Sequence, residues 1–197
     1  VQRAFGRAGS CWRMNRRRMQ AEVLRDALLA LSDRLDNTMG GSLVDARAFD
    51  NLSSSPRDKI HFDVARRSVY LPVLRSAVYE VFQAFDFPDP AVSTGDRATT
   101  VVASQALLML NSEFVMQAAV GLADRLFLQP GDEQQRLVRL YLVAFGREPT
   151  AEEQRADRKF LASLEKSPAA GAAGRERVRD RWTTLCHVVL AANEFIY

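Results

Sequence analysis

Residues that build common metal sites are scarce in this chain. Its 197 residues include two cysteines and two histidines, and the histidines stand far apart in the sequence. A zinc site needs three or four Cys, His or carboxylate ligands, closely spaced in structural sites. We therefore expect no metal site. A zinc ion on His61 and Asp63 is the first alternative. The second is a calcium ion on the carboxylates of Asp86, Asp89 and Asp96.

Long hydrophobic runs and familiar catalytic motifs are also missing. The longest mixed apolar stretch, Val101 to Leu110, is interrupted by Ser104 and Gln105. It falls short of the roughly 18 residues that a membrane span needs, so we expect no span in this chain. The sequence has neither a phosphate-binding G-x-x-x-x-G-K-[ST] loop nor a G-x-S-x-G nucleophile motif. Nucleotide hydrolysis and serine hydrolase chemistry are therefore without support, although an enzyme of another class is still open.

The two cysteines do not form a haem attachment motif. Covalent haem needs C-x-x-C-H, and the segment 183–187 keeps only the final Cys186 and His187, with Thr183 in place of the first cysteine. We interpret Cys186 and His187 as core residues of a helix and expect no cofactor in this chain. Cys11 and Cys186 can form one disulfide or stay as two thiols, and the sequence does not choose between these states.

Positive charge is concentrated at the start of the chain. Residues 1–25 hold seven arginines and one acid, Glu22, whereas the formal net charge of the whole chain is only +3. Such an arm can meet phosphates or an anionic membrane surface. No aromatic residues alternate with these arginines in a recognition motif, so we interpret the arm as solvated and expect no nucleic-acid partner.

Apolar residues recur at three- and four-residue spacing along most of the chain, which predicts an all-α fold. Helix ends are marked by Gly40-Gly41, Pro130-Gly131 and the Gly146 to Thr150 turn, and Thr150 with Glu153 forms a capping box. The predicted helices cover residues 16–36, 72–84, 101–110, 113–128, 132–145, 151–166 and 175–195.

Three segments are predicted to lack helix. Residues 42–59 form an irregular loop, and Phe85 to Gly95 form a structured loop rich in turn residues. Residues 66–71 precede Pro72 and are predicted to be extended, since a residue before proline is pushed out of helical geometry. The expected architecture is a single domain of six to seven helices with one short extended segment at residues 66–71.

Polar residues gather where the chain leaves regular helix, and they are the candidate binding residues. They can form a pocket in which arginines bind an anionic or carbohydrate group, or they can satisfy the backbone groups of irregular segments. We favour the second interpretation and predict an ion pair between Arg67 and Asp86. The candidates are Arg66, Arg67, Tyr70, Asp86, Asp89, Arg97, Thr99, Thr100, Gln105 and Asn111.

Two carboxylates one helical turn apart, Glu22 and Asp26, are a further candidate. They share a helix face, as a general acid and base must, and Arg18 and Arg25 stand within one turn of Glu22. We favour a solvated face of ion pairs over catalysis.

Several segments resemble one family signature in the right order. They are Glu22 to Leu29 (EVLRDALL), Arg66 to Arg75 (RRSVYLPVLR), Phe85 to Pro90 (FDFPDP), Arg97 to Thr100 with Gln105 to Leu107 and Leu110 to Ser112, Gly146 to Thr150 with Glu153, and Trp182 with Asn193 to Phe195. Together they resemble the DUF1553 family, or PSD1 domain, of large exported proteins of planctomycetes and related bacteria. Two departures are Ser76, in place of the Asn of an R-N pair, and the loop 94–97, which is less basic than its counterpart.

The resemblance implies a DUF1553-like helical domain at residues 16–197, preceded by a basic arm at 1–15, in an exported protein of the periplasm or cell surface. Long members of the family commonly carry a c-type cytochrome domain, so any haem is expected upstream. We interpret the chain as a non-catalytic binding or assembly module whose partners are the upstream domains and a polysaccharide or protein. The alternative is part of an enzyme acting on polysaccharide or another anionic substrate through Arg67, Asp86 and Arg97.

Overall fold

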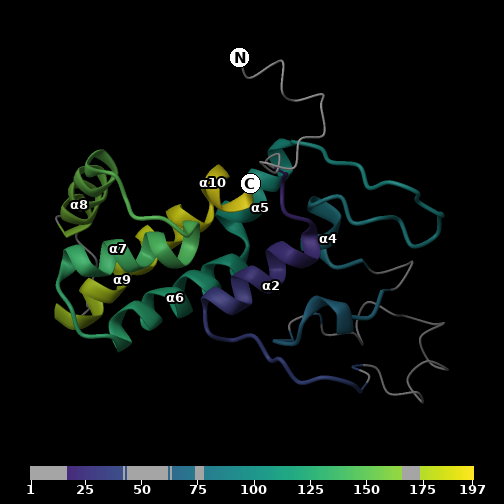
Figure 1. The fold of residues 1–197 in the computed structure, drawn as a ribbon, viewed down its shortest axis with the longest axis horizontal. Helices are drawn as coiled ribbons and strands as arrows, with labels where there is room; N and C mark the ends of the chain where they lie inside the picture. The colour runs from purple at the N-terminus through teal and green to yellow at the C-terminus, as the bar shows by residue number, and fades with distance from the viewer. Residues whose placement is uncertain (1–16, 42, 44–61, 63, 74–77, 166–173) are drawn as a thin grey trace.

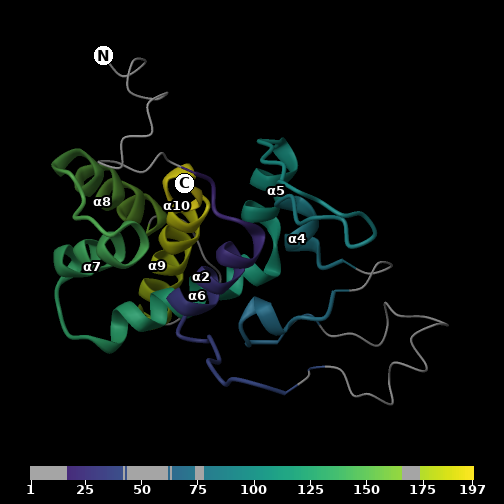
Figure 2. The same cartoon turned by 45° about the vertical axis from the view of Figure 1, so that its right-hand side comes forward.

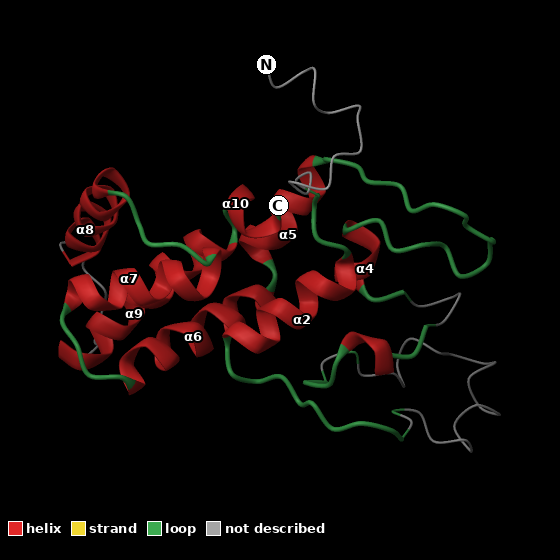
Figure 3. Cartoon of the chain, in the orientation of Figure 1, coloured by secondary structure: helices red, strands yellow, loops and turns green. Residues whose placement is uncertain are grey.

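Helices carry the regular structure of the chain. The computed structural model describes residues 17–41, 43, 62, 64–73, 78–165 and 174–197, and this part has no β-strand (Figure 3). The α-helices are α2 (Ala21–Leu31), α4 (Glu80–Ala84), α5 (Ala103–Asn111), α6 (Glu113–Leu128), α7 (Glu133–Phe145), α8 (Ala151–Glu165), α9 (Gly174–Leu190) and α10 (Asn193–Ile196), and one 3-10 turn, η1 (Ser68–Tyr70), joins them. The predicted all-α fold is confirmed.

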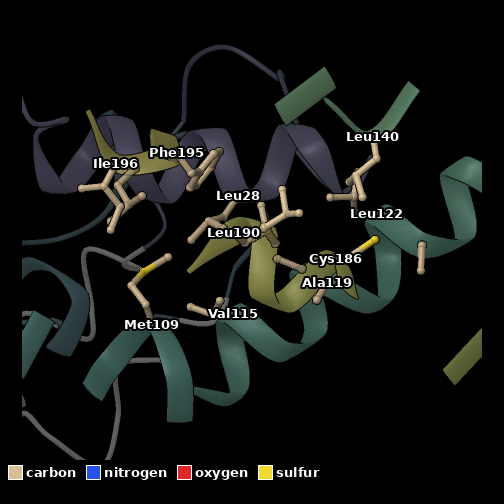
Figure 4. Close-up of a cluster of buried hydrophobic side chains, with 14 of the residues drawn as sticks. Leu28, Met109, Val115, Ala119, Leu122, Leu140, Cys186, Leu190, Phe195 and Ile196 are labelled. Carbon is tan, nitrogen blue, oxygen red and sulfur yellow. The ribbon is translucent and has the colours of Figure 1, made fainter. Parts of the chain in front are cut away.

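The core lies where α2, α6 and α9 meet. The pair α6 and α9 makes the most extensive contact, and α7 and α8 lie at one end of these helices with α4 and α5 at the other (Figures 1 and 2). Figure 4 shows Leu28 of α2, Leu122 of α6 and Leu190 of α9 in one cluster, and all three are fully buried. Burying each such side chain contributes roughly 1.5–3 kcal/mol, so the core holds α2 in place.

The first helix is shorter than the predicted range 16–36. It ends at Leu31 because Asp33 adopts a left-handed conformation (φ 57°), and the amides of Asp33 and Arg34 donate back to the carbonyls of Ala30 and Leu29. This closing pattern satisfies the last carbonyls of the helix. The prediction that Gly40-Gly41 ends the helix is therefore wrong.

The end of α2 crosses α6 at Gly121. A Cβ atom built on Gly121 would lie 2.7 Å from both the Cβ and the carbonyl oxygen of Ser32. Any side chain would push the two helices apart, so glycine sets the close approach of α2 to α6.

The segment 66–71 is not a continuous extended stretch as predicted. The carboxylate of Asp26 accepts hydrogen bonds from the Ser68 amide at 2.8 Å and the Ser68 hydroxyl at 2.6 Å. This side-chain cap starts the 3-10 turn, in which Leu71 donates to the Ser68 carbonyl. Leu71, directly before the proline, does have extended geometry (φ −68°, ψ 135°). Residues 68–70 form the 3-10 turn instead, because Asp26 of α2 caps Ser68.

Other boundaries differ in two places. The helix predicted for residues 72–84 is observed at its end as α4, which begins at Glu80 after extended Tyr79 (φ −59°, ψ 136°). Residues 74–77 of that prediction lie outside the described residues. The helix predicted for 175–195 is broken between α9 and α10, where Ala192 is extended (ψ 143°). The remaining predicted helices agree with the observed bounds within about two residues. The basic arm at 1–15 and nearly all of the loop at 42–59 lie outside the described residues.

No single helix in the described ranges is both long and apolar enough to cross a membrane. The pair α5 and α6 meets that requirement only when the two are taken together across their 53° bend.

Candidate functional site

Asp86 is the centre of a polar network that joins distant segments. Its carboxylate accepts hydrogen bonds from the Arg18 guanidinium (2.8 Å), the Thr100 amide (2.7 Å) and the Thr100 hydroxyl (2.9 Å). Its backbone is left-handed (φ 56°), a conformation that Asp tolerates better than most residues. Partial burial alone would raise the pKa of Asp86, but the hydrogen bonds from Thr100 and Arg18 outweigh it and hold that pKa below its ordinary value.

Arg18 is the buried partner of Asp86. Its side chain is 3% exposed. Its Nη1 atom donates to the Thr100 carbonyl (2.5 Å), and Nη2, which binds Asp86, also donates to the Phe85 carbonyl (3.3 Å). Gln105 extends the network, because its amide donates to the same Thr100 carbonyl at 3.1 Å. The network therefore fastens the residue range 85–100 to the segment that precedes α2.

The predicted ion pair between Arg67 and Asp86 is wrong. Asp86 is engaged by Arg18, and Arg67 is exposed beside η1. The sequence predicts Arg18 only as part of a solvated helix face, because no local pattern identifies it as the partner of a residue far along the chain. Helix-face patterns relate residues three and four positions apart, whereas Arg18 and Asp86 are 68 positions apart in the chain.

A second buried network centres on Arg25. Its side chain is 1% exposed and donates to the Arg66 carbonyl at 2.8 Å, to the Ser68 hydroxyl at 3.3 Å and to the Val64 carbonyl. Together with the cap from Asp26, it holds residues 64–70 against α2.

Arg66 and Tyr70 belong to this second network. The Arg66 guanidinium lies 4.1 Å from the centre of the Tyr70 ring and donates to the carbonyls of Thr38 and Gly40 at 2.7 and 2.6 Å. The Tyr70 hydroxyl accepts from the Gly40 amide at 3.0 Å. These contacts fasten the chain after α2 to residues 66–70, so both side chains satisfy irregular backbone.

The carboxylates of Glu22 and Asp26 are engaged by different loops. Glu22 pairs with Arg97 at 2.9 Å, while Asp26 caps Ser68. Neither the predicted solvated face nor a shared acid and base pair describes them, because their partners come from tertiary contacts.

The remaining candidates are not brought together. The Asp89 carboxylate accepts from the Ala91 amide at 2.8 Å in a local turn, and the Asn111 amide donates to the Leu107 carbonyl at 2.9 Å within its own helix. Thr99 is exposed and lines the hollow described next. The signature therefore splits into two networks, one at the start of α2 and one at Arg25 and Asp26 within it, and a few local contacts.

A hollow of about 540 Å³ lies beside the start of α2, over the Asp86 network. The Met19 amide donates to the Ile196 carbonyl at 2.8 Å, which brings the last residues of the chain beside α2 (Figure 2). Among the described segments, the hollow is lined by Arg17, Arg18, Met19, Gln20, Phe85, Asp86, Asp96, Arg97, Ala98, Thr99, Val101 and Tyr197.

Metal-ligand residues do not cluster in the part of the chain that the structure describes. No group of three or more His, Cys, Asp or Glu side chains there could hold a metal ion. The prediction for His61 and Asp63 falls outside this part.

Cys186 is fully buried, and burial raises the pKa of its thiol. The Nε2 atom of His187 lies 2.9 Å from the Met109 carbonyl oxygen. Since Cys11 is not described, its pairing stays open.

The turn from Gly146 to Thr150, with Glu153, forms a third polar cluster, between α7, α8 and α10. Arg147 binds Glu153 at 2.6 Å and Glu194 at 2.7 Å. The predicted capping box is confirmed, since the Thr150 amide donates to Glu153 and the Glu153 amide donates to the Thr150 hydroxyl. The hydrogen bond from Arg147 is the largest influence that lowers the pKa of Glu153, to about 2.

The low pKa of Glu153 predicts a stability loss in acid. Its ordinary pKa is 4.5 and its folded pKa is about 2, so the ionised carboxylate favours the folded state above pH 4.5 and this contribution is lost as the pH falls toward about 2. Glu153→Gln keeps the helix cap but removes the charge. We expect its melting temperature to fall less steeply than that of the wild type over this window, measured by circular dichroism. Glu152→Gln, an exposed neighbour, is the control and should follow the wild type. Equal slopes for wild type and Glu153→Gln would contradict this account.

Comparison with known proteins gives a family match. A family model described as "PSD1: Protein of unknown function (DUF1553)" matches residues 6–161. Searches of curated proteins and of solved structures found no significant match.

Proposed function

The chain belongs to the PSD1 family of unknown function (DUF1553), and on that premise we propose that it is a non-catalytic module that binds polysaccharide within a larger exported protein. One observation carries this proposal. Four charged side chains around the start of α2 are engaged with one another, in the Arg18–Asp86 and Glu22–Arg97 pairs. They build a fixed surface around a hollow.

The electrostatics of Asp86 favour binding over hydrolysis. A general acid that protonates a glycosidic oxygen at neutral pH needs a raised pKa. The pKa of Asp86 is lowered instead, and its carboxylate is already held by Arg18 and Thr100. The enzyme alternative also needs Arg67 near Asp86 and Arg97, whereas Arg67 is not among the residues of the hollow.

Binding without cleavage is the test of this proposal. The chain should be retained on calcium alginate beads, and incubation with soluble alginate should release no reducing ends above a protein-free control. Release of reducing ends that Asp86→Asn abolishes would overturn the proposal in favour of the enzyme. Absence of retention on alginate, on pectin gel and on cellulose would overturn it as well.

Export and haem are further parts of the proposal. We propose that the whole protein is exported and that any haem c belongs to an upstream domain, because Thr183 replaces one of the two thiols that the attachment motif requires. The chain purified from a host competent for cytochrome c maturation should be colourless. A Soret band that survives denaturation would contradict this.

A further inference from the structure

We propose that the hollow beside the start of α2 binds a carboxylated sugar, with the carboxylate on Arg17 and Arg97. This inference rests on the proposed binding function and names the ligand of that surface. The volume of about 540 Å³ falls within the range of roughly 300–1,000 Å³ typical of small-molecule sites.

Arg97 is held in place but keeps donor groups for a ligand. Its Nη1 atom donates to the carboxylate of Glu22 at 2.9 Å and to the side-chain oxygen of Gln20 at 3.3 Å. The guanidinium also lies 5.6 Å from the centre of the Phe87 ring. All hydrogen bonds from the Arg97 side chain to other described residues come from Nη1. The side chain is 36% exposed. The Nη2 and Nε groups are therefore left as a fork, which suits a carboxylate.

Arg17 adds a second guanidinium to the same hollow. It is exposed, lines the hollow together with Arg97, and makes no hydrogen bond or ion pair to another described residue. An arginine without a structural partner is free to pair with an anion, and two guanidinium groups fit the two oxygens of one carboxylate.

The charge around the hollow tolerates a ligand with one negative charge better than a ligand with two. The guanidinium groups of Arg17, Arg18 and Arg97 are balanced by the carboxylates of Asp86 and Asp96, which line the hollow, and by Glu22, which binds Arg97. Because the buried Arg18 is already neutralised by Asp86, little positive potential remains. A phosphate dianion would meet repulsion from Asp96 that a carboxylate tolerates better.

The rest of the lining suits a sugar ring. Asp96 and Thr99 are exposed polar residues that can exchange hydrogen bonds with ligand hydroxyls. Tyr197 is 43% exposed and Val101 is 78% exposed, so both offer apolar surface to the C–H face of a ring. The Asp86 network fixes the wall behind them, which lowers the ordering cost of binding.

Titration with glucuronate, followed by amide NMR spectra of the chain, tests the inference. We expect saturable shifts at the amides of Ala98, Thr99 and Tyr197, with weaker binding of glucose and of inorganic phosphate. Arg17→Ala should weaken glucuronate binding by about tenfold or more, as expected for loss of a charge-assisted hydrogen bond. Arg97→Lys keeps the charge but loses the fork and should also weaken binding. Arg67→Ala, an exposed arginine outside the hollow, is the matched control and should bind as the wild type does.

Three outcomes would overturn the sugar site. They are glucose binding as tightly as glucuronate, phosphate binding more tightly than glucuronate, and amide shifts confined to another face. If alginate beads retain the chain while glucuronate leaves the amides of the hollow unshifted, this inference fails and the proposed function stands. If alginate is cleaved while glucuronate binds the hollow, the proposed function fails and the sugar site stands.

Discussion

Replacing Arg25 with alanine is expected to remove a large share of the folding free energy, about 3–5 kcal/mol. The side chain is almost fully buried beside Asp26. Its removal leaves the carbonyls of Val64 and Arg66 without their donor and opens a cavity under residues 64–70. Unpaired buried acceptors and cavities each destabilise a fold, and total stabilities of small domains are only about 5–15 kcal/mol.

Urea unfolding monitored by circular dichroism measures this loss. Arg34→Ala is the matched control, because Arg34 follows the same helix but is exposed, and within the described ranges its side chain donates a single hydrogen bond, to Gln117. We expect a change within about 0.5 kcal/mol for this control. If Arg25→Ala does not fold, Arg25→Lys, which keeps the charge and loses the forked geometry, should show an intermediate loss. Equal midpoints for Arg25→Ala, Arg25→Lys and Arg34→Ala would contradict the anchoring role of Arg25.

Breaking the pair of Arg18 and Asp86 is the second large effect. Removing one partner of a fully buried pair typically costs about 3–5 kcal/mol. We expect somewhat less here, because the Asp86 side chain is 18% exposed while that of Arg18 is 3% exposed. Arg18→Ala and Asp86→Ala should each lower the unfolding free energy. The double variant should lose less than the sum of the two, since the second substitution removes a charge that the first has already left unpaired.

Two further variants complete this test of the Arg18–Asp86 pair. Asp86→Asn keeps the side-chain shape and tolerates the left-handed backbone. Its free energy of unfolding should therefore lie between those of the wild type and Asp86→Ala. Arg67→Ala should leave stability nearly unchanged, because Arg67 is exposed. Strictly additive losses for Arg18→Ala and Asp86→Ala, or coupling between Arg67 and Asp86 instead, would show that the network is not arranged as described.

The helical part of the fold could be predicted from sequence where local signals agree. Helix α7 begins after Asp132, whose side chain accepts from the Gln135 amide, and ends at left-handed Gly146. Both caps and the apolar spacing between them are local features of the sequence. The interactions that form this helix can therefore be predicted directly from neighbouring residues. The end of the first helix at Leu31 lacks such a signal, because the left-handed residue that follows it is Asp33 and not a glycine.

The candidate site was less predictable because its chemistry depends on long-range partners. Asp86, Arg97 and Thr99 were identified as candidates, and they do line the hollow or its wall. Arg17 and Tyr197 were not, since nothing in their local sequence distinguishes them from solvated surface residues. Arg67 and Asn111 were candidates but lie outside the hollow. A residue type shows what a side chain can bind, but its position in space decides what it meets.

Most of the helices and the capping box of Thr150 and Glu153 follow from the amino-acid sequence alone, because apolar periodicity and capping act over one or two turns of the chain. Three contacts follow instead from the packing of the folded chain: Asp86 pairs with Arg18, Glu22 pairs with Arg97, and Asp26 caps the 3-10 turn at residues 68–70. Each of these contacts joins α2, or the residue range just before it, to a loop more than forty positions away in the chain. Charged groups act on whatever the packed core brings near them, so their partners are set by the packing of α2 against the rest of the fold.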